Sequence, residues 1–183
     1  MTSLLFFLIS FFATDAAYFK TSNGMVIFES NAALEKIKAK SNHLRGVVNT
    51  NNNTFSFAIQ LNSFQGFNSE LQLEHYNENY VESNLYKEAT FKGNIIENVN
   101  WLAKGKYHVR AKGLFGLHGE QKIETIQATI EHLDETTCTI SANFSLNLSD
   151  YNIKIPRIVH KKLAENIDIQ INATLKKITP SSH

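Results

Sequence analysis

Alternation of apolar and polar side chains is the feature that most constrains what this chain can fold into. Segments 55–61, 107–115, 126–130, 138–148 and 167–175 place an apolar or small residue at every second position, with mostly polar residues between them. Successive side chains of a β-strand point to opposite faces of a sheet, so a period of two predicts strands with one dry and one wet face. The dry face must be covered by other parts of the same sheet or by a second one.

Three weaker alternating segments, residues 25–30, 36–45 and 88–97, bring the expected number of strands to about eight. Turn-forming runs such as Asn51-Asn52-Asn53 and Lys104-Gly105-Lys106 separate the segments. Parallel sheets need near-continuous apolar strands with a helix between each pair, and the sequence shows neither feature. The pattern therefore predicts an all-β, antiparallel protein that is either a barrel or a sandwich.

Two segments depart from the period of two. Over residues of about 70–84, the side chains of Leu73, Tyr76, Tyr80 and Val81 recur at helical spacing, with glutamates on the rest of the wheel. This spacing predicts an amphipathic helix that lies on the sheet. A short helical turn is expected over residues of about 157–165, because it follows Pro156 and proline suits the first turn of a helix.

The N-terminal segment reads as a targeting signal. Residues 4–13 form an uncharged apolar run that is shorter than the roughly 20 residues of a membrane-spanning helix, and small residues follow it. We therefore expect residues 1–16 to be a secretory signal peptide, residues 17–178 to be one domain and residues 179–183 to be a tail. The mature chain would be exported to the periplasm or secreted, with no transmembrane segment.

Composition excludes several classes of function. The 183 residues carry 18 Lys and Arg against 17 Asp and Glu, which gives a net charge of +1. This balance lacks the basic footprint of a nucleic-acid-binding protein. A single cysteine, Cys138, permits no internal disulfide, and its place on the dry face indicates a small buried side chain. The fold must be stabilised by an apolar core.

No motif for catalysis is present in the sequence. It has neither a Gly-x-Ser-x-Gly nucleophile elbow nor a glycine-rich phosphate-binding loop. His75 with Glu74 and Glu78 is the densest group of potential metal ligands, but a site needs at least a third protein ligand and the sequence names no further partner. We therefore expect no catalytic residue and no metal site. A metal-dependent enzyme centred on His75 is the alternative that ranks last.

The predicted dry face is lined by small residues near the middle of several strands. These are Ala39, Ala111, Gly113, Ala128, Ala142 and Ala173. An eight-stranded barrel is just wide enough either to be filled by its own side chains or to hold one small ligand. The sequence leaves both interpretations open, since small barrels also alternate large and small residues to fit their taper. If a cavity exists, no charged residue lines its middle, so its ligand should be apolar and elongated.

Three blocks resemble conserved segments of one known family. They are residues 67–93, in which Tyr86-Lys87-Glu88-Ala89-Thr90-Phe91 leads into a strand, residues 111–119, and the turn Leu148-Ser149-Asp150-Tyr151-Asn152-Ile153. In order and spacing they are similar to the hallmark segments of the YceI-like family. In the third block Asn152 stands where the family usually has a turn glycine, a mild change because asparagine tolerates left-handed geometry.

The resemblance covers residues 20–178 and implies a lipocalin-like antiparallel β-barrel of eight strands. It also implies an exported, non-catalytic protein that binds a polyisoprenoid or isoprenoid quinone inside the barrel, with no other cofactor, and it allows a homodimer. The alternative is a packed barrel that acts as an interaction or structural domain without a ligand.

Because the family has no fixed ligand motif, we choose the apolar pocket from strand phase, with two tyrosines of the predicted helix at its entrance. The expected ligand-binding residues are Phe57, Ile59, Tyr76, Tyr80, Phe91, Val109, Ala111, Gly113, Ile126, Ala128, Ile140, Ala142, Phe144, Ile171 and Ala173.

Overall fold

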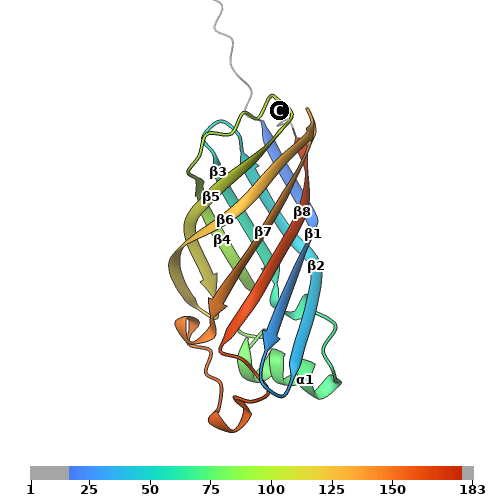
Figure 1. The fold of residues 1–183 in the computed structure, drawn as a ribbon, viewed down its shortest axis with the longest axis vertical. Helices are drawn as coiled ribbons and strands as arrows, with labels where there is room; N and C mark the ends of the chain where they lie inside the picture. Colours follow the sequence, from blue (N-terminus) through green and yellow to red (C-terminus); the bar gives the residue numbers. More distant parts are fainter. Residues whose placement is uncertain (1–16, 179–183) are drawn as a thin grey trace, which may run out of the picture.

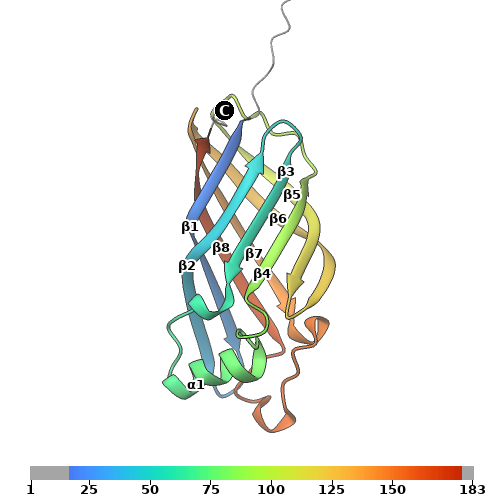
Figure 2. The ribbon, with the colours of Figure 1, turned by 180° about the vertical axis from the view of Figure 1, so that it is seen from behind.

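Eight antiparallel strands close into a single barrel in the computed structural model, which describes residues 17–178 (Figures 1 and 2). Each strand pairs with its neighbours in the chain, and β8 pairs with β1. The predicted fold class is confirmed, and a sandwich is excluded because the sheet has no edge. The predicted signal peptide, residues 1–16, and the predicted tail, residues 179–183, lie outside the described residues. The strands are β1 (Tyr18–Asn31), β2 (Lys36–Asn49), β3 (Thr54–Gln60), β4 (Glu88–Ile95), β5 (Gly105–Leu117), β6 (Glu120–Asp134), β7 (Thr137–Asn147) and β8 (Asn166–Ile178).

The two ends of the barrel are built differently. The lower end in Figure 1, called the helix end here, carries the β1–β2 turn, α1 (Glu70–His75) and the connection from β7 to β8. The opposite end, called the far end, holds the start of β1, the end of β8 and the segment between β4 and β5. Among residues 17–178, helical segments therefore lie beside the barrel opening at the helix end only.

The first two strands are longer than the sequence pattern predicts. β1 begins at Tyr18 rather than near residue 25, because the pairing of β1 with β2 changes register around Gly24. Ser22 and Asn23 both face solvent there, while Thr21 and Gly24 are buried. Two consecutive outward residues are typical of a β-bulge, which breaks the period of two without ending the strand.

The predicted helices are present but shorter than expected. α1 starts after Ser69, whose hydroxyl accepts a hydrogen bond from the backbone N–H of Gln72 at 3.2 Å. The chain continues as one π-helical turn, η2 (Tyr76–Tyr80). The helical segment then stops just before Glu82, which has a φ of 46°. A residue in the left-handed region cannot continue a helix. The β7–β8 connection holds two 3₁₀ turns, η3 (Leu148–Tyr151) and η4 (Arg157–Val159), and of the predicted range 157–165 only the three residues of η4 are helical.

Closely packed side chains fill the barrel at the far end. The ring of Phe19 lies 5.9 Å from Trp101 and 5.4 Å from His132, and Trp101 lies 5.3 Å from His132. On adjacent strands of the wall, His132 of β6 pairs with Cys138 of β7, and Cys138 pairs with Leu175 of β8. Cys138 is fully buried, as predicted, and burial raises the pKa of its thiol to about 12. This group, called the far-end plug, closes one side of the interior.

His132 introduces a polar atom into the far-end plug. Its side chain is 4% exposed, and its Nε2 has no hydrogen-bond partner within residues 17–178. Burial lowers the pKa of His132, so the imidazole is neutral in the folded protein over a wider pH range than in the unfolded chain. When the unfolded state binds more protons than the folded state, stability falls as the pH is lowered.

We therefore expect the wild-type protein to lose stability as the pH falls below about 6.5, by up to about 1.4 kcal/mol per pH unit from this one group. The variant His132→Leu should lose less stability over the same pH range, because it lacks the imidazole that takes up a proton when the chain unfolds. The measurement is the thermal midpoint of each protein at about pH 7.5 and about pH 5. His43→Leu makes the same change at an exposed histidine and is the control. Equal pH dependence in wild type and His132→Leu would contradict the assignment.

Candidate functional site

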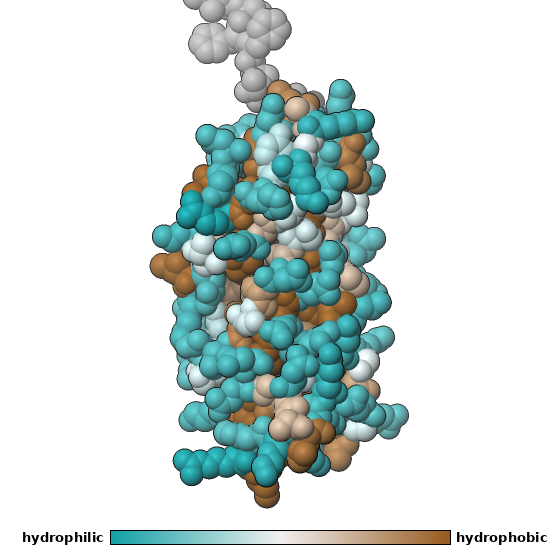
Figure 3. All heavy atoms as spheres, in the orientation of Figure 1, coloured by the Kyte–Doolittle hydropathy of each residue, from teal (hydrophilic) through white to brown (hydrophobic). Residues whose placement is uncertain are grey.

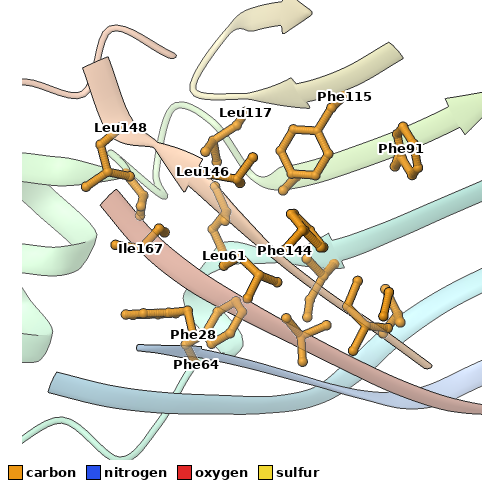
Figure 4. A pocket seen from close by; sticks show the side chains of 18 of the residues that line it. Phe28, Leu61, Phe64, Phe91, Phe115, Leu117, Phe144, Leu146, Leu148 and Ile167 are labelled. Atoms are coloured by element: carbon orange, nitrogen blue, oxygen red, sulfur yellow. The ribbon is translucent and has the colours of Figure 1, made fainter. Parts of the chain in front are cut away.

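A cavity of about 520 Å³ occupies the barrel between the far-end plug and the helix end. All eight strands contribute to its wall, and nearly all of the side chains that reach it are apolar. Figure 4 shows side chains from opposite walls, among them Phe28, Phe115 and Leu146, pointing into the same interior space. The volume lies in the range of ordinary small-molecule sites, roughly 300–1,000 Å³. The dry face of the sheet therefore surrounds a space rather than a filled core.

The structure brings together almost all of the residues chosen from strand phase. Every one except Gly113 lines the cavity, although contact with a ligand stays a prediction. The cavity-lining members are Phe57, Ile59, Tyr76, Tyr80, Phe91, Val109, Ala111, Ile126, Ala128, Ile140, Ala142, Phe144, Ile171 and Ala173.

Gly113 does not line the cavity, although it is in the same phase as Ala111. It lies directly opposite Gly93 in the β4–β5 pair, and the two backbones approach closely. A Cβ atom on Gly113 would collide with the carbonyl oxygen of Lys92. The small residue here allows two strands to pack closely, which is a common role of glycine inside a strand.

Small side chains account for the open space in the middle of the barrel. Ala128 and Ala142 face each other across β6 and β7, and Ala111 and Ala173 line the same cavity. A methyl group at each position leaves volume that leucine or phenylalanine would occupy. The alternative of an interior filled by side chains between these four alanines is therefore wrong. Ala39, the other small residue named from the sequence, is buried but is not part of this wall.

A connected series of aromatic rings forms one part of the wall. Along β3, β4, β5 and β7 the ring centroids of Phe55 and Phe91 are 4.9 Å apart, those of Phe91 and Phe115 are 5.9 Å apart, and those of Phe115 and Phe144 are 6.3 Å apart. Tilted and edge-to-face pairs at such distances are favourable contacts. The chain of rings gives the cavity a rigid apolar side.

A second aromatic group lies where the cavity meets the helix end. The Tyr76 ring stacks on Phe28 at 5.5 Å and lies 4.9 Å from Phe67, and its hydroxyl donates a hydrogen bond to the carbonyl oxygen of Leu61 at 3.1 Å. Burial raises the pKa of Tyr76 and of Tyr80, so both phenols stay neutral at physiological pH. Tyr76 therefore forms part of the inner wall and adds no charge to the cavity.

Polar side chains reach the cavity mainly at the helix end. Glu35, Gln72, His75 and Lys162 line it there, from the β1–β2 turn, α1 and the β7–β8 connection. Glu35 accepts hydrogen bonds from the side-chain amides of Asn68 at 3.1 Å and Gln72 at 3.0 Å. These contacts join the β1–β2 turn to α1. The arrangement gives the cavity one polar opening, called the mouth here.

His118 fixes the segment that follows α1, a role that sequence reasoning missed. It lies in the β5–β6 turn with a φ of 52°, and its Nε2 is 2.6 Å from a carboxylate oxygen of Glu82. Its Nδ1 is 3.0 Å from the carbonyl oxygen of Tyr151, and its ring packs on Tyr86 at 4.5 Å. Three separate loops at the helix end therefore meet at one histidine.

The turn at Asn152 agrees with its expected geometry. Asn152 has a φ of 57°, and its backbone N–H bonds to the carbonyl oxygens of Leu148 and Ser149. Its side-chain amide also donates to Glu120. Asparagine thus serves in a left-handed position that glycine would more commonly occupy.

Side chains suited to metal binding do not converge in the described part of the chain. Within residues 17–178 no set of three or more His, Cys, Asp or Glu side chains is placed to hold a metal ion, and this includes the His75 group considered above. In the same residues no helix has the length and apolar character needed to cross a membrane. What the arrangement can do chemically is surround an apolar molecule.

Comparison with known proteins places this fold in a family. A polyisoprenoid binding domain from Saccharophagus degradans has the same fold, with 16% sequence identity and a TM-score of 0.74 over 90% of this chain and 99% of that one. BcnA of Burkholderia cenocepacia has 14% identity and a TM-score of 0.65 over 82% of this chain and 95% of that one. A YceI protein of Campylobacter jejuni has 15% identity and a TM-score of 0.59 over 76% of this chain and 84% of that one. A search of curated protein sequences finds no match. The model of the YceI-like domain matches residues 16–175. Because that match spans nearly the whole chain, the resemblance noted in the sequence is confirmed, and the protein belongs to the YceI-like family.

Proposed function

We propose that this protein is an exported, non-catalytic lipid-binding protein that holds an elongated apolar molecule, a polyisoprenoid chain or an isoprenoid quinone, in the barrel cavity. The observation that carries the proposal is the cavity of about 520 Å³, apolar along the barrel and polar at one end. A polyisoprenoid binding domain among the structures with the same fold supports the choice of ligand. The hollow interior favours this function over a packed interaction domain.

The expected energetics agree with binding of an apolar chain. Burial of apolar surface contributes roughly 25 cal/mol per Å², so about 300 Å² of buried ligand surface contributes about 7.5 kcal/mol before the entropic costs of association. The uncharged wall gives no site for an ionic group within the barrel. A polar head group would instead lie at the mouth, where the side chains of Glu35, Gln72, His75 and Lys162 can reach it.

Protein produced in bacteria should carry lipid. We expect organic extraction and mass spectrometry to yield isoprenoid species in near-stoichiometric amount. Delipidated protein should then bind added quinone, which can be followed through the fluorescence of the single tryptophan, Trp101. Protein that is empty on isolation and does not respond to added quinone would contradict the proposal.

The variant Ala142→Phe tests whether the ligand uses the cavity. Ala142 faces the space between the walls, so a phenyl ring should fill it and weaken ligand binding by at least about tenfold without lowering the thermal midpoint. In a tightly packed interior the same change would cost about 1–3 kcal/mol of stability. Asn143→Phe, on the exposed face of the same strand, is the matched control and should bind normally. Loss of stability together with unchanged binding would count against the cavity as the site.

Export is a separate part of the proposal and rests on the apolar run of residues 4–13. We expect the full-length gene product in a bacterial host to be recovered outside the cytoplasm, with an intact mass that corresponds to cleavage after Ala16. Cell fractionation and mass spectrometry measure both. Uncleaved protein confined to the cytoplasm would remove export from the proposal and leave ligand binding unaffected.

A further inference from the structure

The β7–β8 connection extends past the barrel at the helix end and exposes an isoleucine. Both ribbon views show residues 152–165 reaching beyond the strands, to one side of α1 (Figures 1 and 2). Ile158, in η4 (Arg157–Val159), is 92% exposed. Figure 3 shows hydrophobic side chains at this lower tip of the molecule. An isoleucine held almost entirely in water gains free energy if an apolar phase covers it.

The same connection concentrates positive charge. Lys154, Arg157, Lys161 and Lys162 fall within nine residues, and no acidic residue occurs between Asp150 and Glu165. Within the described chain, none of these four cations has an acidic partner within 4.0 Å. In a protein with a net charge of only +1, this is a local basic patch, defined here as residues 154–162.

The basic patch is part of the mouth. Val159, Lys162 and Leu163 line the cavity, so the connection forms one wall of the opening. The carbonyl oxygen of Lys161 accepts a hydrogen bond from the backbone N–H of Leu34 at 2.7 Å, which ties the connection to the β1–β2 turn. Leu34 is 70% exposed. Exposed apolar side chains therefore lie beside the cavity together with cations that have no acidic partner among residues 17–178.

Charge is divided between the two sides of the helix end. α1 carries Glu70 and Glu74, and η2 carries Glu78. Both ribbon views place α1 and residues 152–165 on different sides of the barrel end. A negatively charged surface would attract the patch and repel the helix. The division of charge thus favours one tilt of the barrel on such a surface.

We propose that residues 154–162 dock the mouth on an anionic lipid bilayer, with Ile158 inserted at the level of the head groups and Arg157, Lys161 and Lys162 beside the phosphates. Interfacial membrane anchors combine apolar side chains with neighbouring Lys and Arg residues, and each basic residue near an anionic surface strengthens the attraction. Docking requires no ligand in the cavity. With the proposed function, it lets a lipid pass between bilayer and barrel without crossing open water.

Vesicle sedimentation tests the proposal with the full mature chain. We expect wild-type protein to pellet with vesicles of phosphatidylcholine and phosphatidylglycerol, to bind at least about tenfold more weakly to phosphatidylcholine alone, and to be released by high salt. Ile158→Glu should weaken binding to the anionic vesicles by about tenfold or more. Leu102→Glu is the matched control: Leu102 is 84% exposed at the far end, and its replacement should leave binding within about twofold of wild type.

A charge-reversal pair separates the basic patch from general electrostatics. Arg157→Glu with Lys161→Glu should abolish binding to anionic vesicles, whereas Lys104→Glu with Lys106→Glu at the far end should preserve it. Delipidated and lipid-loaded protein should bind alike, so failure of docking is distinguishable from failure of ligand binding. Absence of wild-type binding to anionic vesicles would overturn the proposal, as would equal losses for Ile158→Glu and Leu102→Glu. Binding that depends on a protein acceptor rather than on lipid would also overturn it.

Discussion

Closure of the sheet between β1 and β8 is the constraint on which the rest of this structure depends. Pairing from Tyr18 with Ile178 to Ser30 with Ile167 removes both sheet edges. Every strand then has a hydrogen-bonded neighbour on each side, so the fold does not need a second layer to cover an edge. A sandwich would press its two dry faces together at about 10 Å and leave no room between them. In a closed barrel of eight strands, the size of the inward-pointing side chains decides whether space remains inside.

The free energy that stabilises the barrel is therefore distributed unevenly along it. At the far end, Phe19, Trp101 and His132 pack ring against ring, and Cys138 and Leu175 are completely buried. In the middle, the alanines of β5 to β8 leave a cavity whose wall is supported mainly by strand pairing and by contacts between neighbouring phenylalanines. Because the Nε2 of His132 has no hydrogen-bond partner among residues 17–178, even the packed end carries a polar cost that the remaining contacts must offset.

The strands and the cavity wall could be predicted from the sequence because both follow from one periodicity. Ala142 and Ile171 were placed on the inner face by counting residues, and the structure puts them next to each other in the cavity. The same counting failed at the bulge near Gly24, where two outward residues interrupt the period, and at Gly113, where phase cannot show that another backbone lies in the way. The helical spacing predicts the helix after Ser69 but not where it ends, because the left-handed Glu82 leaves no signal in the pattern of apolar residues.

The helix end was the least predictable part because its contacts join residues that no local pattern connects. Glu82 and His118 meet across 36 positions of the chain, and Leu34 bonds to Lys161 across a longer separation. These contacts nevertheless determine how a ligand could enter. The far-end plug blocks one side, so under the proposed function an elongated lipid enters through the mouth with its apolar end first. Its polar end then remains beside Gln72, His75 and Lys162, because the described side chains deeper in the cavity are almost all apolar and cannot replace the water that it would lose.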